Sequence, residues 1–176
     1  HWINQGMLSL RDIQKILHCG KPIVWTMHDM WPFTGICHYS HDCHNYINGC
    51  HNCPLLVRPR ENDLSYKLFR RKERLYEHSK IEFVACSRWL AGQARQSRLL
   101  RGQHVNDIPN AISTVAFKPH NKEKAREICR LPFDKKLILF SAFRTTSPIK
   151  GLRYFTEACR IYNERHPEMK EQIAIV

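Results

Sequence analysis

The sequence predicts an α/β protein that contains two parallel sheets. Short apolar runs alternate along the chain with longer segments of helical periodicity, which is typical of parallel strands joined by helices. The clearest runs are residues 22–28, PIVWTMH, and residues 136–142, KLILFSA, both apolar as buried strands are. The 176 residues are 43% hydrophobic, so the chain can form a substantial core.

Five strands and five helices are expected in alternation. The strands are placed at residues 22–28, 82–86, 105–108, 136–142 and 173–176. Ser9, Ser87 and Asn121 carry short polar side chains that can cap helices. The helices are placed at residues 10–19, 64–79, 88–99, 122–130 and 151–165. In the helix at 64–79, Leu64, Leu68 and Leu75 are expected to form the apolar side, and the basic residues a solvated face.

A boundary between two domains is expected near residues 108–120. This segment, IPNAISTVAFKPH, contains two prolines and has little periodicity. The helix and strand that follow it read like the start of a second sheet. The sequence therefore predicts a first Rossmann-like domain over residues 1–112 and the start of a second over residues 113–176.

The segment at residues 35–54 carries four cysteines and four histidines in twenty positions. Cys37, Cys43, Cys50 and Cys53 follow the spacing C-x5-C-x6-C-x2-C, and a C-x2-C turn directs two thiolates at one point. The segment lacks a continuous apolar run, so a metal bound by four ligands would supply the stability that burial does not. We expect a structural zinc site, with two disulfides as the competing interpretation. A nearby histidine could replace a thiolate: His38, His41, His44 or His51.

The remaining cysteines, Cys19, Cys86, Cys129 and Cys159, lie scattered in apolar segments. They are interpreted as small buried hydrophobic residues, which fits a reducing compartment. The chain shows no signal peptide, and no run approaches the about 18 apolar residues of a membrane span. These observations predict a cytoplasmic protein.

Two groups of polar residues follow predicted strands, where ligands bind in open α/β sheets. His28 and Asp29 follow the first strand, and a histidine beside a carboxylate can act as a hydrogen-bond donor or general acid/base, or simply cap a loop. Arg144 and Lys150 follow the strand at 136–142, and Gly151 opens a helix after them. Two cations at a helix amino terminus suit a diphosphate, although a solvated basic loop has the same composition.

The chain has a formal net charge of +12, so its surface attracts anions such as phosphates, nucleic acid or an acidic bilayer. One interpretation is a zinc-stabilised module that binds nucleic acid. Against it, the aromatic residues occupy core-like positions and do not alternate with the cations as stacking platforms would. The basic helix is more simply a solvated face, or a patch in peripheral contact with anionic lipid at the inner face of the membrane.

Four segments together resemble family 4 glycosyltransferases of the GT-B fold, in the branch that makes bacterial capsules and exopolysaccharides. They are KPIVWTMHDMWPFTGIC with its downstream GCHNCP, then FVACSRWLA, then IPNAI followed by FKP, and LILFSAF with KGLRYFTEA. The resemblance implies a GT-B pair of Rossmann-type domains, both incomplete here, with an inserted Cys-rich zinc loop. It implies transfer of a sugar, generally with retention, from a nucleotide-sugar donor to a glycan or lipid-linked acceptor.

The resemblance also implies roles for single residues. His28 resembles the family histidine that faces the donor sugar, and Arg144 and Lys150 match the basic pair that binds the donor diphosphate. Asn110 corresponds to an asparagine between the domains, where Ala111 replaces the usual glycine. The cysteines resemble a family metal site that shapes an acceptor-side loop, so zinc is expected to be structural and no catalytic metal is expected. His28 and the two cations are expected to line opposite sides of one cleft.

Two parts of the family pattern are missing. These are the glycine-rich loop of the first strand and the E-x7-E segment of the donor domain. The chain also begins at His1 and stops within an apolar run. The sequence is therefore interpreted as a fragment that is inactive by itself.

Overall fold

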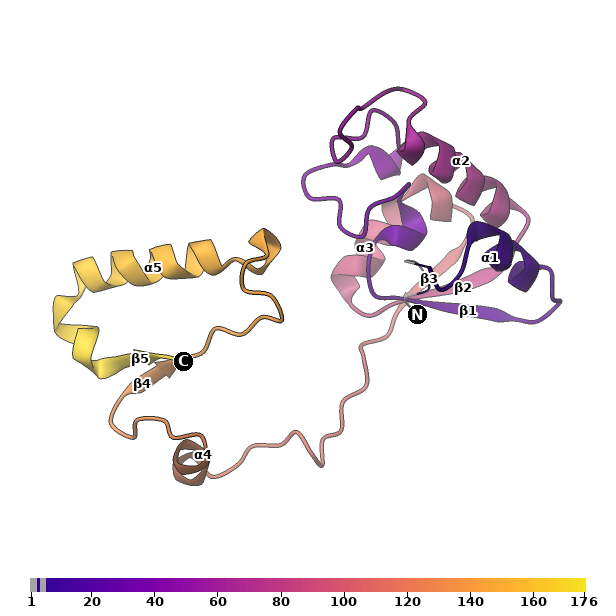
Figure 1. Ribbon diagram of the computed structural model, residues 1–176. Helices are drawn as coiled ribbons and strands as arrows, with labels where there is room; N and C mark the ends of the chain where they lie inside the picture. Colours follow the sequence, from indigo (N-terminus) through magenta and orange to yellow (C-terminus); the bar gives the residue numbers. More distant parts are fainter. Residues whose placement is uncertain (1–2, 4–5) are drawn as a thin grey trace. The chain divides into compact units, whose positions relative to one another are not determined.

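The computed structural model describes residue 3 and residues 6–176, and the chain divides into two compact units. Unit 1 comprises His1–Ile112 and unit 2 comprises Ser113–Val176. Both contain parallel strands connected by helices (Figure 1), so the α/β class with parallel sheets predicted from the sequence is confirmed.

Unit 1 has a three-stranded sheet of order β1-β2-β3, made of Ile23–Met27, Ile81–Ala85 and His104–Asp107. All neighbours are parallel, and Trp25 pairs with Phe83 while Met27 pairs with Ala85. Helix α1 (Leu10–Leu17) precedes β1, α2 (Leu64–Glu77) precedes β2, and α3 (Arg88–Gln96) joins β2 to β3. Unit 1 also contains short 3-10 helices at Trp31–Phe33 and Asn45–Ile47, between β1 and α2, and at Arg98–Leu100, between α3 and β3.

Side-chain caps fix where the helices begin. Ser9 accepts from the Asp12 amide, and the Asp12 carboxylate accepts from the Ser9 amide in return, which completes a capping box. Ser87 caps α3 in the same way through the Leu90 amide at 3.2 Å. These caps confirm the predicted helix starts at both serines.

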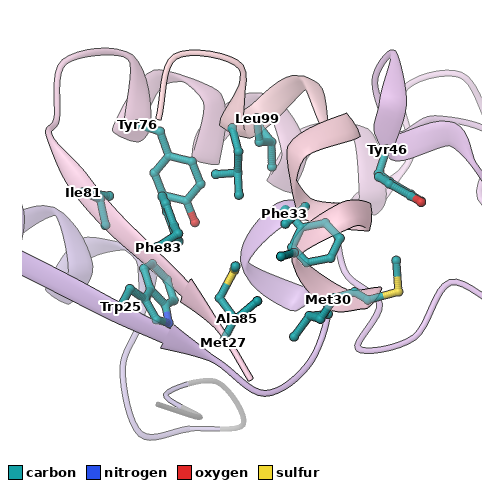
Figure 2. Close-up of a cluster of buried hydrophobic side chains, with 14 of the residues drawn as sticks. Trp25, Met27, Met30, Phe33, Tyr46, Tyr76, Ile81, Phe83, Ala85 and Leu99 are labelled. Carbon is teal, nitrogen blue, oxygen red and sulfur yellow. The ribbon is translucent and has the colours of Figure 1, made fainter. Parts of the chain in front are cut away.

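The core of unit 1 is formed where the sheet meets the helices and the loop after β1. Trp25 of β1 stacks on Phe83 of β2, with ring centroids 5.7 Å apart, and Tyr76 of α2 packs edge-on against both (Figure 2). Figure 2 also shows Met30 and Phe33 from the loop after β1 in this cluster. The loop is thus a component of the core.

The apolar side of α2 differs from the prediction. Leu68 and Leu75 are partly buried against the core as predicted, but Leu64 is 54% exposed, and the fully buried side chains are those of Ser65, Phe69, Lys72 and Tyr76. The buried side of α2 faces residues 31–35, whose carbonyl oxygens accept from Lys72 and Tyr76. One of the basic residues expected in solvent is therefore buried completely.

Unit 2 consists of α4 (Lys122–Ile128), β4 (Lys136–Ile138), α5 (Leu152–Arg165) and β5 (Ile173–Ile175), and β4 pairs with β5 in parallel. Asn121 caps α4 through the Lys124 amide at 2.9 Å, as predicted. Strand β4 ends at Ile138, earlier than the predicted 142, so the residues after it belong to a loop. Among the described residues, all buried hydrophobic side chains lie between Leu10 and Leu100, in unit 1.

The prediction that the scattered cysteines are buried is wrong. Cys19 and Cys129 are exposed, and Cys86 and Cys159 are only partly buried. Cys19 and Cys129 lie at helix carboxyl ends, where the apolar stripe no longer faces a core. Within the part of the chain that the structure describes, no helix is long and apolar enough to span a membrane.

Candidate functional site

The candidate site of unit 1 begins at the carboxyl end of β1. His28 follows the strand directly and is exposed. The Asp29 carboxylate accepts from the Trp31 amide at 2.9 Å and pairs with Nδ1 of His38 at 2.8 Å. Asp29 therefore connects the strand end to the start of the Cys-rich loop, residues 35–54. Its partner, His38, was expected from the sequence only as an alternative metal ligand.

The segment after Asp29, residues 31–35, has all five of its carbonyl groups bound by buried side chains. We call it the carbonyl loop. The hydroxyl of Tyr76 donates to the Pro32 oxygen at 3.0 Å, and that of Ser97 donates to the Phe33 oxygen at 2.7 Å. The ammonium group of Lys72 donates to the oxygens of the other three residues: Trp31 at 2.5 Å, Thr34 at 3.0 Å and Gly35 at 3.4 Å.

Lys72 is fully buried and lies with its Nζ 3.5 Å from the centre of the Trp31 ring. Burial lowers the pKa of this lysine to about 7, and the nearby Cys50, Cys37 and Asp29 oppose that shift. Three carbonyl dipoles and an aromatic face replace the water that the ammonium group loses. Lys72 thereby fixes the loop that carries the chain from β1 into the Cys-rich loop.

The sequence analysis missed Lys72, although a signal was available. The buried residues of α2 recur at positions 65, 69, 72 and 76, which is helical spacing for one face. A lysine on the stripe that also carries Phe69 and Tyr76 indicates a buried cation with a structural partner. The high charge of residues 70–74 obscures this spacing in the sequence.

The four cysteines of the Cys-rich loop line one small cavity of about 10 Å³, roughly the space of a single water molecule. Cys50 and Cys53 are buried, and Cys37 and Cys43 are partly buried. The backbone amide of Gly35 donates to the Cys50 sulfur at 3.2 Å. All four cysteines are free, so the disulfide interpretation has no support in the described residues.

Burial raises the pKa of the Cys50 thiol to about 12, although the Gly35 amide lowers it, and burial also raises the pKa of Cys37. The neighbouring sulfurs raise the pKa values of Cys37 and Cys50 further, since a thiolate nearby disfavours another. Within the described residues, no group of three or more His, Cys, Asp or Glu side chains is arranged so that it could hold a metal ion. The structure thus brings the cysteines to one cavity without placing them as a finished coordination shell.

The far end of the Cys-rich loop is attached to α2 through Asp63. Its carboxylate accepts from the Cys53 amide at 2.8 Å, from the Tyr66 amide at 3.1 Å and from the Ser65 hydroxyl at 2.6 Å. Burial by itself would raise the pKa of Asp63, but these hydrogen bonds and one from Arg60 lower it to about 2. One carboxylate therefore caps α2 and holds the last cysteine of the loop.

The predicted diphosphate-binding residues of unit 2 lie on the loop between β4 and α5. Arg144 and Lys150 are both exposed. The Ser147 amide donates to the Arg144 oxygen at 3.2 Å, and the Lys150 amide donates to the Ser147 oxygen at 3.0 Å, so two turns bring the cations onto one loop. Gly151 precedes α5 with a φ of 77°, a backbone conformation that favours glycine.

Asn110 is exposed and belongs to unit 1, close to the boundary with unit 2. His28 and Asp29 also lie in unit 1, whereas Arg144 and Lys150 lie in unit 2. The predicted cleft between these two groups of residues therefore stays a prediction.

The chain is similar to WcaC of Escherichia coli (strain K12), whose name assigns it to glycosyl transfer in colanic acid biosynthesis. The two sequences are 36% identical over 81 residues, a stretch that covers 43% of this chain and 20% of WcaC. The match thus spans about a fifth of the relative's length. No family model and no solved structure matches the chain. The similarity supports a relationship to glycosyltransferases.

Proposed function

We propose that the chain is part of a glycosyltransferase that takes a sugar from a nucleotide-diphosphate donor. The acceptor would be a glycan or lipid-linked glycan in the synthesis of a cell-surface polysaccharide. The observation that carries the proposal is the similarity to a protein named for glycosyl transfer in colanic acid biosynthesis. Parallel sheets with polar residues after their strands are compatible with it.

In this proposal Arg144 and Lys150 bind the donor diphosphate and neutralise the charge that develops as it leaves. Their exposure on one loop leaves both cations accessible to a ligand. The amino terminus of α5 follows at Gly151, where backbone amides favour an anion. Loss of one positioned cation in such a reaction costs about 2–4 kcal/mol of transition-state stabilisation.

His28 is proposed to face the donor sugar from unit 1, with Asp29 holding the backbone behind it. Asp29 binds the Trp31 amide and His38, so the turn after β1 is fixed on both sides. An imidazole carried on this anchored backbone can donate a hydrogen bond to a sugar hydroxyl. Asn110 is proposed to belong to the segment that joins the two domains.

The cysteines are proposed to hold one structural zinc ion through Cys37, Cys43, Cys50 and Cys53. Their convergence on one cavity and the amide donated to Cys50 suit a thiolate site, in which backbone amides commonly support the sulfurs. His51 lines the same cavity and is the histidine best placed to replace a thiolate. When bound, zinc would supply stability to the loop and would lower the pKa values of the thiols.

The direct test is binding of nucleotide sugars by the whole chain. UDP-glucose, UDP-galactose and GDP-mannose would be titrated in a calorimeter against wild type, Arg144→Ala and Lys150→Ala. At least one donor should bind, and each variant should weaken that binding by about tenfold or more, as expected for a lost charge-assisted hydrogen bond.

Lys170→Ala is the matched control, because Lys170 is another exposed cation of unit 2, on the segment that follows α5. It should bind the donor as wild type does. Equal binding by all four proteins, or no binding of any nucleotide sugar, would contradict the assignment.

A further inference from the structure

An open hollow lies against the Cys-rich loop, and Cys43 is the one proposed zinc ligand in its lining. It encloses about 550 Å³, within the range of ligand pockets. Polar side chains suited to hydrogen-bond hydroxyl groups line part of it, beside apolar surface from residues such as Pro54 and Leu55. We call it the polar hollow and define it by His41, Asp42, His44, Asn45 and Asn52.

An exposed aromatic pair lies next to this hollow. Tyr39 and Trp89 have ring centroids 6.2 Å apart, and His41 packs edge-on against Tyr39 at 4.9 Å. Tyr39 is 42% exposed and Trp89 is 54% exposed. His41 belongs to both groups, so aromatic surface and polar lining form one continuous site.

The backbone that carries the aromatic pair is anchored, although the rings are exposed. The residues on either side of Tyr39 are anchored, since the His38 oxygen accepts from the Met30 amide at 2.9 Å and Ser40 is buried. Trp89 lies in the first turn of α3, which is capped by Ser87. Backbone that is ordered before a ligand arrives loses little entropy on binding, which favours affinity.

The position of the pair in the fold also points to a ligand. Tyr39 follows the carboxyl end of β1 and Trp89 follows that of β2, and ligands of open α/β sheets bind beyond these ends. His41 and Asn52 have φ values of 51° and 44°, which non-glycine residues seldom adopt. Strained backbone is common where a loop must present side chains to a ligand.

From these observations we infer that the aromatic pair and the polar hollow form a carbohydrate-binding subsite for a neutral pyranose ring. The aromatic faces would stack on the C–H groups of the sugar, while the carboxylate, amide and imidazole groups would bind its hydroxyls. The choice of carbohydrate rests on the proposed function, and the sugar would belong to the acceptor because the site is part of unit 1, whereas the cations proposed to bind the donor are part of unit 2.

The test is a titration of the whole chain followed by nuclear magnetic resonance. Methyl β-D-glucopyranoside, methyl β-D-galactopyranoside and methyl α-D-mannopyranoside would each be added to wild type while the indole N–H signal of Trp89 is observed. At least one glycoside should shift this signal saturably, with a dissociation constant of about 1–20 mM. This measurement needs no variant that could fail to fold.

Variants then locate the site. Trp89→Ala and Tyr39→Ala should each weaken glycoside binding by about five- to tenfold, whereas Trp89→Phe should keep most of it because the aromatic face remains. Tyr154→Ala is the control, since Tyr154 is 67% exposed in unit 2. No shift of the Trp89 signal with any glycoside would overturn the inference, as would equal binding by wild type and Trp89→Ala.

The same titration with UDP-glucose separates this inference from the proposed function. Glycoside binding without nucleotide-sugar binding would keep the carbohydrate subsite and refute the donor assignment. Nucleotide-sugar binding that needs Arg144 and Lys150, without any glycoside effect at Trp89, would keep the donor assignment and refute the subsite.

Discussion

Lys72 places its amino group, with a pKa lowered by burial to about 7, on the side of α2 that packs into unit 1. Its ammonium group donates to three carbonyl oxygens and faces the Trp31 ring, so each lost interaction with water has a partner. A buried cation of this kind specifies geometry, because few other arrangements of the carbonyl loop would satisfy it.

Replacing Lys72 by methionine should lower the free energy of unfolding by about 2–4 kcal/mol, because three carbonyl oxygens lose their donor. The cost of burying a charge also disappears, but we expect this gain to be the smaller effect. Lys67→Met, on an exposed position of the same helix, should change it by less than about 0.5 kcal/mol. Urea denaturation of both variants provides the comparison. Equal stability of Lys72→Met and wild type would show that the carbonyl loop does not need the lysine.

The low pKa of Asp63 predicts that the stability of the fold decreases at acid pH. Its pKa is lowered from 3.8 to about 2 in the folded chain, so its ionised form stabilises the fold above pH 3.8, and this contribution disappears as the pH falls to about 2. Asp63→Asn keeps an oxygen that can cap α2 but removes the charge. The difference in unfolding free energy between wild type and this variant should therefore narrow between pH 5 and pH 2. A difference that stays constant with pH would contradict the assignment.

At the scale of elements, the Cys-rich loop is held in place by contacts with neighbouring segments. It begins at the carbonyl loop, ends at the cap of α2 and contacts α3 through the hydrogen bond between Tyr46 and Gln93. Its only regular element among the described residues is the 3-10 helix Asn45–Ile47. Anchors at both ends and one metal in the middle would be enough to fix such a loop.

Purified protein should therefore contain about one zinc per chain, and chelation should raise hydrogen exchange across residues 35–54 while the β1–β3 sheet stays protected. Cys50→Ser should lose the metal. Cys129→Ser, which changes an exposed cysteine of unit 2, should retain it. Metal analysis and hydrogen exchange by mass spectrometry check both statements. Wild-type protein without zinc would refute the site.

Gly35 lets the Cys-rich loop approach α2 closely. A Cβ at this position would lie 2.5 Å from the backbone oxygen of Ser65 and 3.1 Å from the Cβ of Cys50. Gly35→Ala should therefore destabilise the fold by about 1–3 kcal/mol through overpacking. Gly92→Ala in α3 is the control, because a Cβ there meets nothing within 4 Å, and it should be neutral or stabilising. Thermal unfolding distinguishes the two, and equal melting temperatures would contradict the steric argument.

At the scale of the whole molecule, the two units differ in how much core they have. All the buried hydrophobic side chains of the described residues belong to unit 1. In unit 2 the buried residue among those described is Arg126, whose guanidinium donates to the oxygens of Pro132, Phe133 and Lys135. Burial of apolar surface is the main driving force of folding, so the units should differ in stability.

Hydrogen exchange of the whole chain should accordingly show slow amides in β1 and β2 and much faster amides in α5, by about two orders of magnitude or more. Pulse labelling with mass spectrometry of peptides from both units measures this directly. Comparable protection of α5 and β2 would mean that unit 2 has a stabilising interaction beyond its own packing.

The sequence predicted element type well where a local signal was strong. The strands β1 and β2, the caps at Ser9, Ser87 and Asn121 and the helices α2 and α5 follow from periodicity and short-range chemistry. His28 and Asp29 keep their predicted place at the end of β1, whereas Arg144 and Lys150 lie farther along a loop because β4 ends at Ile138. The sequence did not predict which residues contact the site residues, as the pairing of Asp29 with His38 illustrates.

The sequence by itself determined an α/β chain with parallel strands, a cysteine segment after the first strand and two cations after the fourth. The tertiary structure decided which side of α2 is buried, that Lys72 binds the carbonyl loop, and that Tyr39 and Trp89 meet beside the polar hollow. The physical reason is that periodicity and capping act over a few residues. Burial of a charge and contact between rings 50 positions apart depend on how distant segments pack.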